Sequence, residues 1–338
     1  MGLIIPFFIQ HQGCPHRCLF CNQHSIAGTA QVGANGVDPT HGLGDTIEQW
    51  LSRARSRTSV QVAFFGGSFT CLDEALQYRL LQGVAPYISR GRVDSIRLST
   101  RPDCLSDEIC GFLIANGVTT VEIGAQSMAD HVLDRAKRGH TVADTAQALN
   151  LLRGHGLEIG LQLMVGLPGE TTRSFLDGVD AVAALAPDFV RLYPALVLEN
   201  TELAKLYHNS PWRPLSLARA VVLTGRARER LLGQGIDVIR MGLQDSTELA
   251  RQVLAGPYHP AFGELVLTRS WRLRIGRLLK RAGSGKTLNL GVSERDYSAL
   301  AGVNKTNLKR LKNLSHGAAL EVQTERFLKR NTFYYAVH

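Results

Sequence analysis

The sequence lacks any long apolar run. No stretch approaches the roughly eighteen consecutive apolar residues that a membrane-spanning helix requires. Residues 1–9 are apolar, but they have no basic leader and are too short for a secretory signal peptide. We therefore interpret them as a buried strand, and we expect a cytoplasmic protein that does not contact a membrane.

Cysteine is also scarce. The 338 residues include six cysteines, and the thiols of cytoplasmic proteins stay reduced. These few thiols therefore indicate metal or redox chemistry before disulfides. The composition is otherwise ordinary for a folded protein, with 44% hydrophobic and 20% charged residues.

Acidic residues are few in the last part of the chain. Residues 264–338 contain fifteen Lys and Arg but five Asp and Glu, so they carry the whole positive excess of the protein, which has a net charge of +9. Such asymmetry is typical of a basic domain that faces a polyanion. The alternative is that these charges form a solvated basic surface without a binding role.

Short apolar runs alternate with amphipathic segments through the first two-thirds of the chain. The runs are rich in β-branched or aromatic residues, which predicts strands at 3–9, 60–65, 95–99, 120–124, 158–165 and 189–193. The segments between them predict helices at 45–56, 74–89, 106–116, 142–155 and 171–185. A further helix at 217–234 and a strand at 237–241 follow.

This alternation predicts an α/β fold with a parallel sheet and right-handed crossovers. Six repeats without a dinucleotide fingerprint favour a partial (β/α)6 TIM-like barrel over a doubly wound sheet. We expect this barrel over residues 1–243, a connection over 244–263, and a small basic α+β domain over 264–338. The polar and glycine-rich segments follow the strands, so they should gather at one mouth of the barrel.

The strongest motif follows the first predicted strand. Cys14, Cys18 and Cys21 are spaced C-x3-C-x2-C, and thiolates are the ligands that iron–sulfur clusters require. Three protein ligands leave one iron open for a substrate or cofactor. The alternatives are a zinc site whose fourth ligand is His11, His16 or His24, or three unrelated buried cysteines.

With an aromatic residue, Phe20, before its last cysteine, this loop resembles the signature of the radical S-adenosylmethionine (SAM) superfamily. The resemblance implies a 4Fe–4S cluster on the three cysteines, whose open iron binds the amino and carboxylate groups of SAM. It also implies that one electron cleaves SAM to a 5′-deoxyadenosyl radical, and a reductant such as flavodoxin or ferredoxin must supply that electron. Phe20 matches the position that lies against the adenine.

Further positions match the SAM contacts of that family. Gly66, Gly67 and Ser68 follow the second strand, where the family carries a Gly-Gly-Glu-like motif that contacts the SAM amino group, with Ser68 in place of the Glu. Gln126 and Ser127, after the fourth strand, resemble the family's Gln-Ser pair near the ribose and carboxylate of SAM.

Gln162 is another candidate contact because it lies inside an apolar strand. A buried amide needs hydrogen-bond partners, and bound SAM would supply them; a hydrogen bond within the core is the alternative. The sequence assigns no catalytic side chain. Cys71, Cys104 and Cys110 show no cluster spacing, and we interpret them as small core residues.

The middle of the chain resembles more specifically the catalytic subunit of Elongator, a tRNA-modifying radical SAM enzyme. The resemblance covers about residues 4–241 and rests on residues 100–103, 121–127, 138–141, 166–169 and 191–194. The compact cysteine spacing instead looks like the oxygen-independent coproporphyrinogen oxidase branch. No acetyltransferase domain fits in the residues after 241, so we expect none.

The resemblance and the basic segment together predict a radical SAM enzyme that modifies RNA, with tRNA bound through residues 264–338. Aromatic residues that are suited to stack on unpaired bases are interleaved with the basic ones, namely Trp271, Phe327, Phe333, Tyr334 and Tyr335. Two alternatives stay open. One is a radical SAM enzyme that acts on a small molecule or peptide, and the other is a non-catalytic, zinc-stabilised RNA-binding protein.

Overall fold

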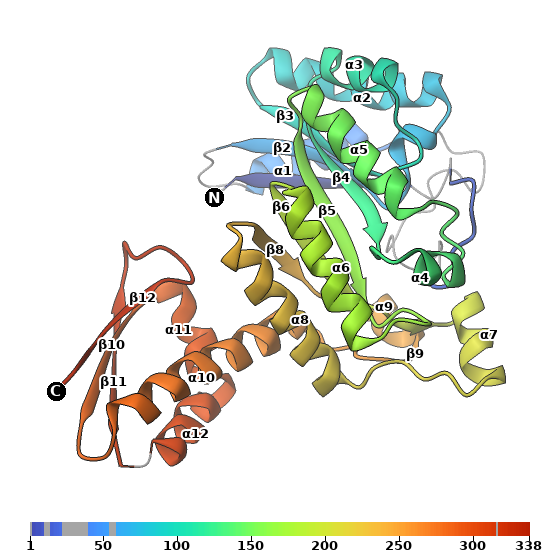
Figure 1. Cartoon of the computed structure of the whole chain (residues 1–338). Coiled ribbons are helices and arrows are strands. Elements are labelled where there is room, and N and C mark those ends of the chain that lie inside the picture. Colours follow the sequence, from blue (N-terminus) through green and yellow to red (C-terminus); the bar gives the residue numbers. More distant parts are fainter. Residues whose placement is uncertain (1, 10–13, 22–39, 54–58, 316) are drawn as a thin grey trace. The chain divides into compact units, whose positions relative to one another are not determined.

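The chain divides into two compact units (Figure 1). A computed structural model describes residues 2–9, 14–21, 40–53, 59–315 and 317–338. The first unit comprises Met1–Ala220 and Ala227–Tyr258, and the second comprises Val221–Arg226 and His259–His338. None of the described helices is both long and apolar enough to span a bilayer.

A seven-stranded sheet forms the centre of the first unit. Its strands are β1 (Leu3–Phe8), β2 (Val60–Phe65), β3 (Ser95–Thr100), β4 (Val118–Gln126), β5 (Glu158–Val165), β6 (Phe189–Pro194) and β8 (Asp237–Met241). They lie in chain order across the sheet, and every neighbouring pair is parallel. The carboxyl ends of all seven strands therefore lie along one edge, where the loops that follow them meet.

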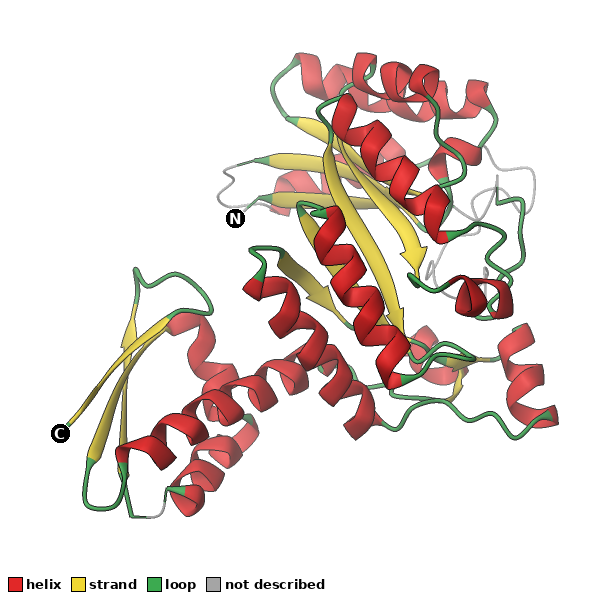
Figure 2. Ribbon diagram, in the orientation of Figure 1, coloured by secondary structure: helices red, strands yellow, loops and turns green. Residues whose placement is uncertain are grey.

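Helices connect the strands, and α5 and α6 lie across one face of the sheet (Figures 1 and 2). The helices are α1 (Leu43–Arg53), α2 (Glu74–Ser89), α3 (Asp107–Ala115), α4 (Asp130–Arg135), α5 (Val142–Gly154), α6 (Thr172–Leu185), α7 (Glu202–Asn209), α8 (Leu217–Gly233) and α9 (Thr247–Gln252). Local sequence fixes where they begin. The Ser106 and Thr141 hydroxyls, for example, accept hydrogen bonds from the backbone of Ile109 and Asp144 in the first turns of α3 and α5.

The predicted partial barrel is confirmed, with β8 as a seventh strand at its far edge. Every predicted strand and helix is present with slightly shifted ends. Several elements were not predicted: α4, α7, α9 and a small antiparallel pair formed by β7 (Val197–Leu198) and β9 (Val253–Ala255). These short elements lie in the loops beyond the strands, where no long hydrophobic periodicity marks them.

The second unit is a mixed sheet covered by helices, as the α+β prediction requires. Its elements are α10 (Phe262–Ala282), β10 (Thr287–Ser293), α11 (Glu294–Ala301), α12 (Thr306–Leu314), β11 (Ala319–Glu325) and β12 (Phe333–Val337). The central strand β10 pairs in parallel with β11 and antiparallel with β12. Apolar residues of α10, including Trp271 and Ile275, are buried, as are Leu288 and Leu290 of β10.

One prediction about the cysteines was wrong. Cys71 and Cys104 form a disulfide and are not isolated core residues. Cys71 ends a short 3-10 helix after β2, and Cys104 lies in the loop after β3. Because β2 and β3 are parallel neighbours, the loops begin side by side although the cysteines are 33 residues apart in sequence. Cys110 is a buried residue of α3, as predicted, and burial raises the pKa of its thiol to about 11.

The disulfide gives the first testable prediction. Under non-reducing denaturing conditions the iron-free chain should alkylate at four of its six cysteines. Mass spectrometry of the peptides should place the two protected thiols at Cys71 and Cys104. Replacing both by Ser should lower the free energy of unfolding of the oxidised protein by about 3–4 kcal/mol, because a crosslink of this span restricts the unfolded chain. Alkylation of all six cysteines without reductant would contradict the pairing.

Candidate active site

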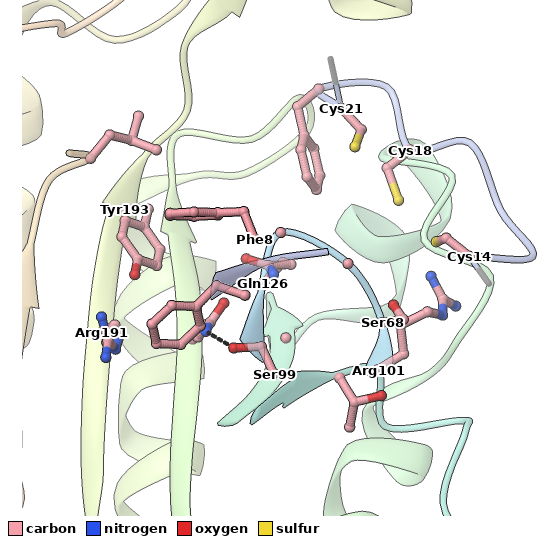
Figure 3. Close-up of a pocket in the computed structure, with 18 of the residues that line it drawn as sticks. Phe8, Cys14, Cys18, Cys21, Ser68, Ser99, Arg101, Gln126, Arg191 and Tyr193 are labelled. Atoms are coloured by element: carbon pink, nitrogen blue, oxygen red, sulfur yellow. Dashed lines mark hydrogen bonds between the residues drawn. The ribbon is translucent and has the colours of Figure 1, made fainter. Parts of the chain in front are cut away.

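A cavity of about 340 Å³ opens at the carboxyl ends of the strands in the first unit. The three cysteines of the motif lie along one side of it (Figure 3). The predicted site residues that line the cavity are Cys14, Cys18, Phe20, Cys21, Gly66, Gly67, Ser68, Gln126 and Gln162. Ser127 is the exception, because it is buried and does not line the cavity. The strand ends thus bring nearly all of the candidate residues together.

The cysteine loop is held by two helices that the sequence did not predict. The Leu19 backbone N–H donates to the Ala136 carbonyl just after α4 at 3.1 Å, and its carbonyl accepts from Leu203 N–H of α7 at 2.8 Å. Leu19 is buried with Leu203 in one apolar cluster. Phe20 packs against a second cluster that contains Val132 of α4 and Ala136. Contacts with α4 on one side and with α7 on the other therefore fix the position of the cysteine loop.

Gly139 is a specific docking point for the cysteine loop. Its φ is +72°, a conformation that side chains rarely adopt. A Cβ atom placed on it would lie 2.3–2.5 Å from the ring atoms of His16. His16 stands between the first two cysteines, so its close approach to Gly139 positions the loop. The residue after Gly139, His140, is buried, and burial lowers its pKa to about 4, so its ring is neutral near pH 7.

Two buried arginines, which were not predicted as site residues, lie beside the cysteines. Arg138 donates from Nη1 to Cys18 Sγ at 3.1 Å and from Nη2 to the Gly124 carbonyl at 2.6 Å. Arg101 donates from Nη2 to the Arg138 carbonyl at 2.6 Å and is paired with Asp103. Both arginines lie in segments that resemble the Elongator subunit, but the sequence motifs alone did not indicate that either of them belongs to the site.

Two buried guanidinium donors beside the cysteine loop, Arg101 Nη1 and Arg138 Nε, have no partner among the described residues. His140 Nδ1 is also unpaired, but it is an acceptor, because the neutral ring donates from Nε2 to the Ala125 carbonyl at 3.3 Å. Unpaired buried N–H groups are unfavourable, and an anionic group in the cavity would satisfy them. No three His, Cys, Asp or Glu side chains of the described residues are placed to hold a single metal ion. Three thiols with cationic neighbours fit a larger anionic cluster and a carboxylate-bearing cofactor.

The glycine pair after β2 is required by packing against β1. Gly66 has φ +88°, and a Cβ on it or on Gly67 would lie 3.2 Å from the Ile9 carbonyl oxygen. The turn can therefore lie close to the chain that leads into the cysteine loop. Ser68, the next residue, is buried and lines the cavity.

Gln126 has a strained backbone at the end of β4. Its φ is +67°, which is unusual for a residue other than glycine, and the β4–β5 register shifts between Ile123 and Gln126. Left-handed backbone of this kind costs about 1 kcal/mol or more and is concentrated at functional sites. The irregularity places Gln126 in the cavity wall, whereas Ser127 turns into the protein.

Gln162 is hydrogen-bonded within the protein, which favours the core alternative for its amide nitrogen. Its Nε2 donates to Glu122 Oε2 at 2.9 Å and to Ser99 Oγ at 3.3 Å. Glu122 is fully buried and also binds Arg97 at 3.1 Å and Arg191 at 2.8 Å. The floor of the cavity is therefore a buried polar network.

Comparison with known protein families identifies this arrangement. The model of the radical SAM superfamily matches residues 9–182, just over half of the chain, and a radical SAM C-terminal domain model matches residues 187–272. The chain belongs to the radical SAM superfamily. Radical SAM enzymes use a 4Fe–4S cluster and SAM, and the thiols and unpaired donors of this cavity fit both groups. The alternative of a non-catalytic zinc protein is therefore wrong.

Two curated relatives and one solved structure illustrate the similarity of this radical SAM enzyme. A tRNA uridine(34) acetyltransferase from Methanocaldococcus infernus is 28% identical over 64% of this chain and 47% of its own length. The protein YhcC from Escherichia coli K12 is 27% identical over 57% of this chain and 63% of its own. The structure of Methanocaldococcus infernus Elp3 with an N-terminal deletion superposes with a TM-score of 0.61 at 23% identity, covering 79% and 62% of the two chains. The chain spans about half the length of the first acetyltransferase relatives.

The docking of His16 on Gly139 gives the second prediction. Gly139→Ala should displace the cysteine loop, because the new Cβ would overlap the His16 ring and the backbone conformation would be strained. Anaerobic reconstitution should then load less than half of the wild-type iron, measured with the ultraviolet–visible spectrum. Gly111→Ala is the matched control, because a Cβ at this position in α3 meets nothing within 4 Å. Equal iron content in Gly139→Ala and the wild type would show that the contact does not position the loop.

Proposed function

We propose that this radical SAM enzyme modifies RNA, with tRNA as the favoured substrate. Its relatives include tRNA uridine(34) acetyltransferases, and its second unit carries a cluster of cations that suits a nucleic-acid backbone. Because the chain spans only part of those relatives, the proposal does not extend to acetyl transfer. Reduction of the cluster needs an electron donor such as flavodoxin or ferredoxin.

The cavity residues have distinct roles in this proposal. Cys14, Cys18 and Cys21 would hold the cluster, and Phe20 and the turn after β2 would contact SAM. When bound, SAM and the reduced cluster supply a 5′-deoxyadenosyl radical that removes a hydrogen atom from the substrate. Arg138 has no carboxylate partner among the described residues and has an unpaired Nε, so we assign it to the SAM carboxylate.

The cationic cluster of the second unit is the observation that carries the RNA proposal. Burial, together with the nearby charges of Arg310 and Arg269, lowers the pKa of Arg272. Arg269 and Arg272 are one turn apart on α10, and Arg310 is on α12. The helices α10 and α12 pack against each other, and like charges on neighbouring helices repel one another, so a polyanion would relieve the repulsion. Phosphate contacts from Lys and Arg provide most of the affinity in nucleic-acid binding.

The strand side of the second unit is less suited to phosphate. Tyr334 of β12 lies over Gly291 of β10 and donates a hydrogen bond to Glu325 of β11 at 2.8 Å. Glu321 is on the same side of β11, since it stands four residues before Glu325. Carboxylates there would repel phosphate groups. The helices α10 and α12 are therefore the favoured contact surface.

The aromatic residues divide into buried and exposed groups. Trp271 is only 2% exposed and packs against Phe333, with the Arg274 guanidinium over both rings, so these side chains belong to the core. Phe327 is 96% exposed, and Tyr335 is half exposed. Of the aromatics predicted to stack on bases, only the exposed ones keep that possibility.

The cluster assignment gives the third prediction. Replacing Cys14, Cys18 or Cys21 by Ala should abolish incorporation of about four irons and the formation of 5′-deoxyadenosine, because each thiolate is a ligand. Iron content and chromatographic detection of 5′-deoxyadenosine measure the two effects. Cys110→Ala is the matched control, since this buried thiol lies in α3 outside the cavity lining. Full cluster loading in any of the three variants would remove that cysteine from the ligand set.

The cationic cluster gives the fourth prediction. Changing Arg269, Arg272 and Arg310 together to Gln should weaken tRNA binding and reduce the magnitude of the slope of log K against log salt by about 2 to 3, since each lost phosphate contact contributes roughly 0.7–0.9. Fluorescence anisotropy at several salt concentrations measures both effects. Uncoupled SAM cleavage should stay unchanged, because the variants lie outside the cavity.

A matched control separates a local effect from a general loss of charge. Changing Lys286, Arg326 and Lys329 to Gln removes the same number of charges from the second unit outside α10 and α12. This control should keep most of the wild-type slope. Equal losses in both triple variants would contradict the helix surface. A wild type without salt-dependent RNA binding would contradict the RNA proposal and favour a small-molecule or peptide substrate.

A further inference from the structure

The described lining of the cavity is strongly cationic. It includes four arginines, Arg101, Arg138, Arg191 and Arg240, and no Asp or Glu. Arg101 and Arg138 lie beside the cysteine loop. Arg191 and Tyr193 lie on the side of the cavity away from the cysteines (Figure 3). The cavity therefore has two separate cationic regions.

The second region is built by the last strands of the sheet. Gln162 of β5 pairs with Arg191 of β6, and Arg191 pairs with Arg240 of β8. Paired residues of parallel neighbours project from the same face of a sheet, so these three side chains form one row inside the barrel. Tyr193 stands two residues after Arg191 and thus on the same face, nearer to the carboxyl end. We call Arg191, Tyr193 and Arg240 the far subsite.

The charges around the far subsite do not balance. Glu122 is shared by Arg191 and Arg97, and Arg97 has a second carboxylate, Glu158, at 3.5 Å. These two acids neutralise two of the three guanidinium groups. Arg240 donates from Nε to the Gly242 carbonyl at 3.2 Å and has no carboxylate partner among the described residues. One positive charge of this polar floor is therefore uncompensated.

SAM alone does not account for both cationic regions. It carries a single carboxylate, and Arg138, at the cysteine loop, is placed for it under the proposed function. The cysteine loop follows β1 and the far subsite lies on β6 and β8, at opposite edges of the sheet. We propose that the far subsite binds the carboxylate of a second small molecule, a co-substrate of the radical reaction beside RNA. This inference rests on the proposed function, because it assigns SAM to the other region.

The chemistry of the far subsite suits a carboxylate better than an RNA phosphate. Arg191 is 8% exposed, and its guanidinium is held over the Phe65 ring at 5.4 Å. A phosphodiester in a polymer needs cations that it can reach from the surface, whereas a terminal carboxylate fits a buried planar guanidinium. Burial is the main factor that raises the pKa of Tyr193, so its hydroxyl stays protonated and can donate to an oxyanion.

Apolar side chains in the same cavity indicate the chemistry of the rest of the ligand. Phe8, Phe65, Leu243 and Leu249 line the same cavity. An apolar body with one carboxylate therefore matches both the walls and the charge. Benzoate is a simple probe of this chemistry, and benzamide is its uncharged counterpart.

The experiment titrates benzoate and benzamide into full-length protein that carries the cluster and saturating SAM, with isothermal titration calorimetry as the measurement. Benzoate should bind at least about tenfold more tightly than benzamide, because a charged hydrogen bond to arginine is lost in the amide. Arg240→Gln should weaken benzoate binding by about tenfold or more without a change in SAM affinity. Arg240→Lys keeps the charge and should lose less. Arg240 is the residue to change because its removal leaves no buried acid unpaired.

Arg173→Gln is the matched control, since Arg173 is an arginine of the same unit with a side chain that is 92% exposed. It should leave benzoate binding unchanged. Three results would overturn the inference: equal affinity for benzoate and benzamide, tighter binding of inorganic phosphate than of benzoate, or a loss of SAM affinity in Arg240→Gln. Failure to load iron or SAM would instead contradict the proposed function, and benzoate titration of the iron-free chain would still test the far subsite.

Discussion

The polar interior of this half-barrel depends on one buried carboxylate. Glu122 is fully buried, and its oxygens bind two guanidinium groups and one amide within 3.1 Å. Removal of such partners from a buried charge costs several kcal/mol, so Arg97, Arg191 and Gln162 are held in place. These residues come from β3, β6 and β5, and with β4 the network fixes the inward side chains of four strands. In many barrels, packed apolar side chains fill the interior. Here the polar network instead forms the floor of an open cavity.

The cysteine loop depends on a different kind of support. The loop is docked through Leu19, Phe20 and His16 onto elements that come more than a hundred residues later. The buried Arg138 joins this support to the site, because one of its nitrogens contacts a cysteine sulfur and another binds the β4 chain. The position of the metal ligands is therefore a property of the whole first unit.

The architecture could be predicted from the sequence because long segments with a regular hydrophobic period determine it. All predicted strands of the barrel exist, and the motifs that follow β1, β2, β3 and β4 meet at one cavity. Side-chain directions and contacts between distant residues could not be predicted from the sequence. Ser127 follows a strained Gln126 and turns inward. The partners of Gln162 come from β3 and β4. The Cys71–Cys104 pair needs the parallel order of β2 and β3.

The contact between His16 and Gly139 also restricts how this protein can change. Because the ring occupies the space that a Cβ would take, position 139 cannot gain a side chain while position 16 keeps an imidazole. The two positions are 123 residues apart in the chain, yet the side chain that one position can carry depends on the side chain at the other. A variant that enlarges one must shrink or redirect the other. In this fold, the position of the cysteine loop therefore depends on the absence of a side chain at a glycine that lies far away in the sequence.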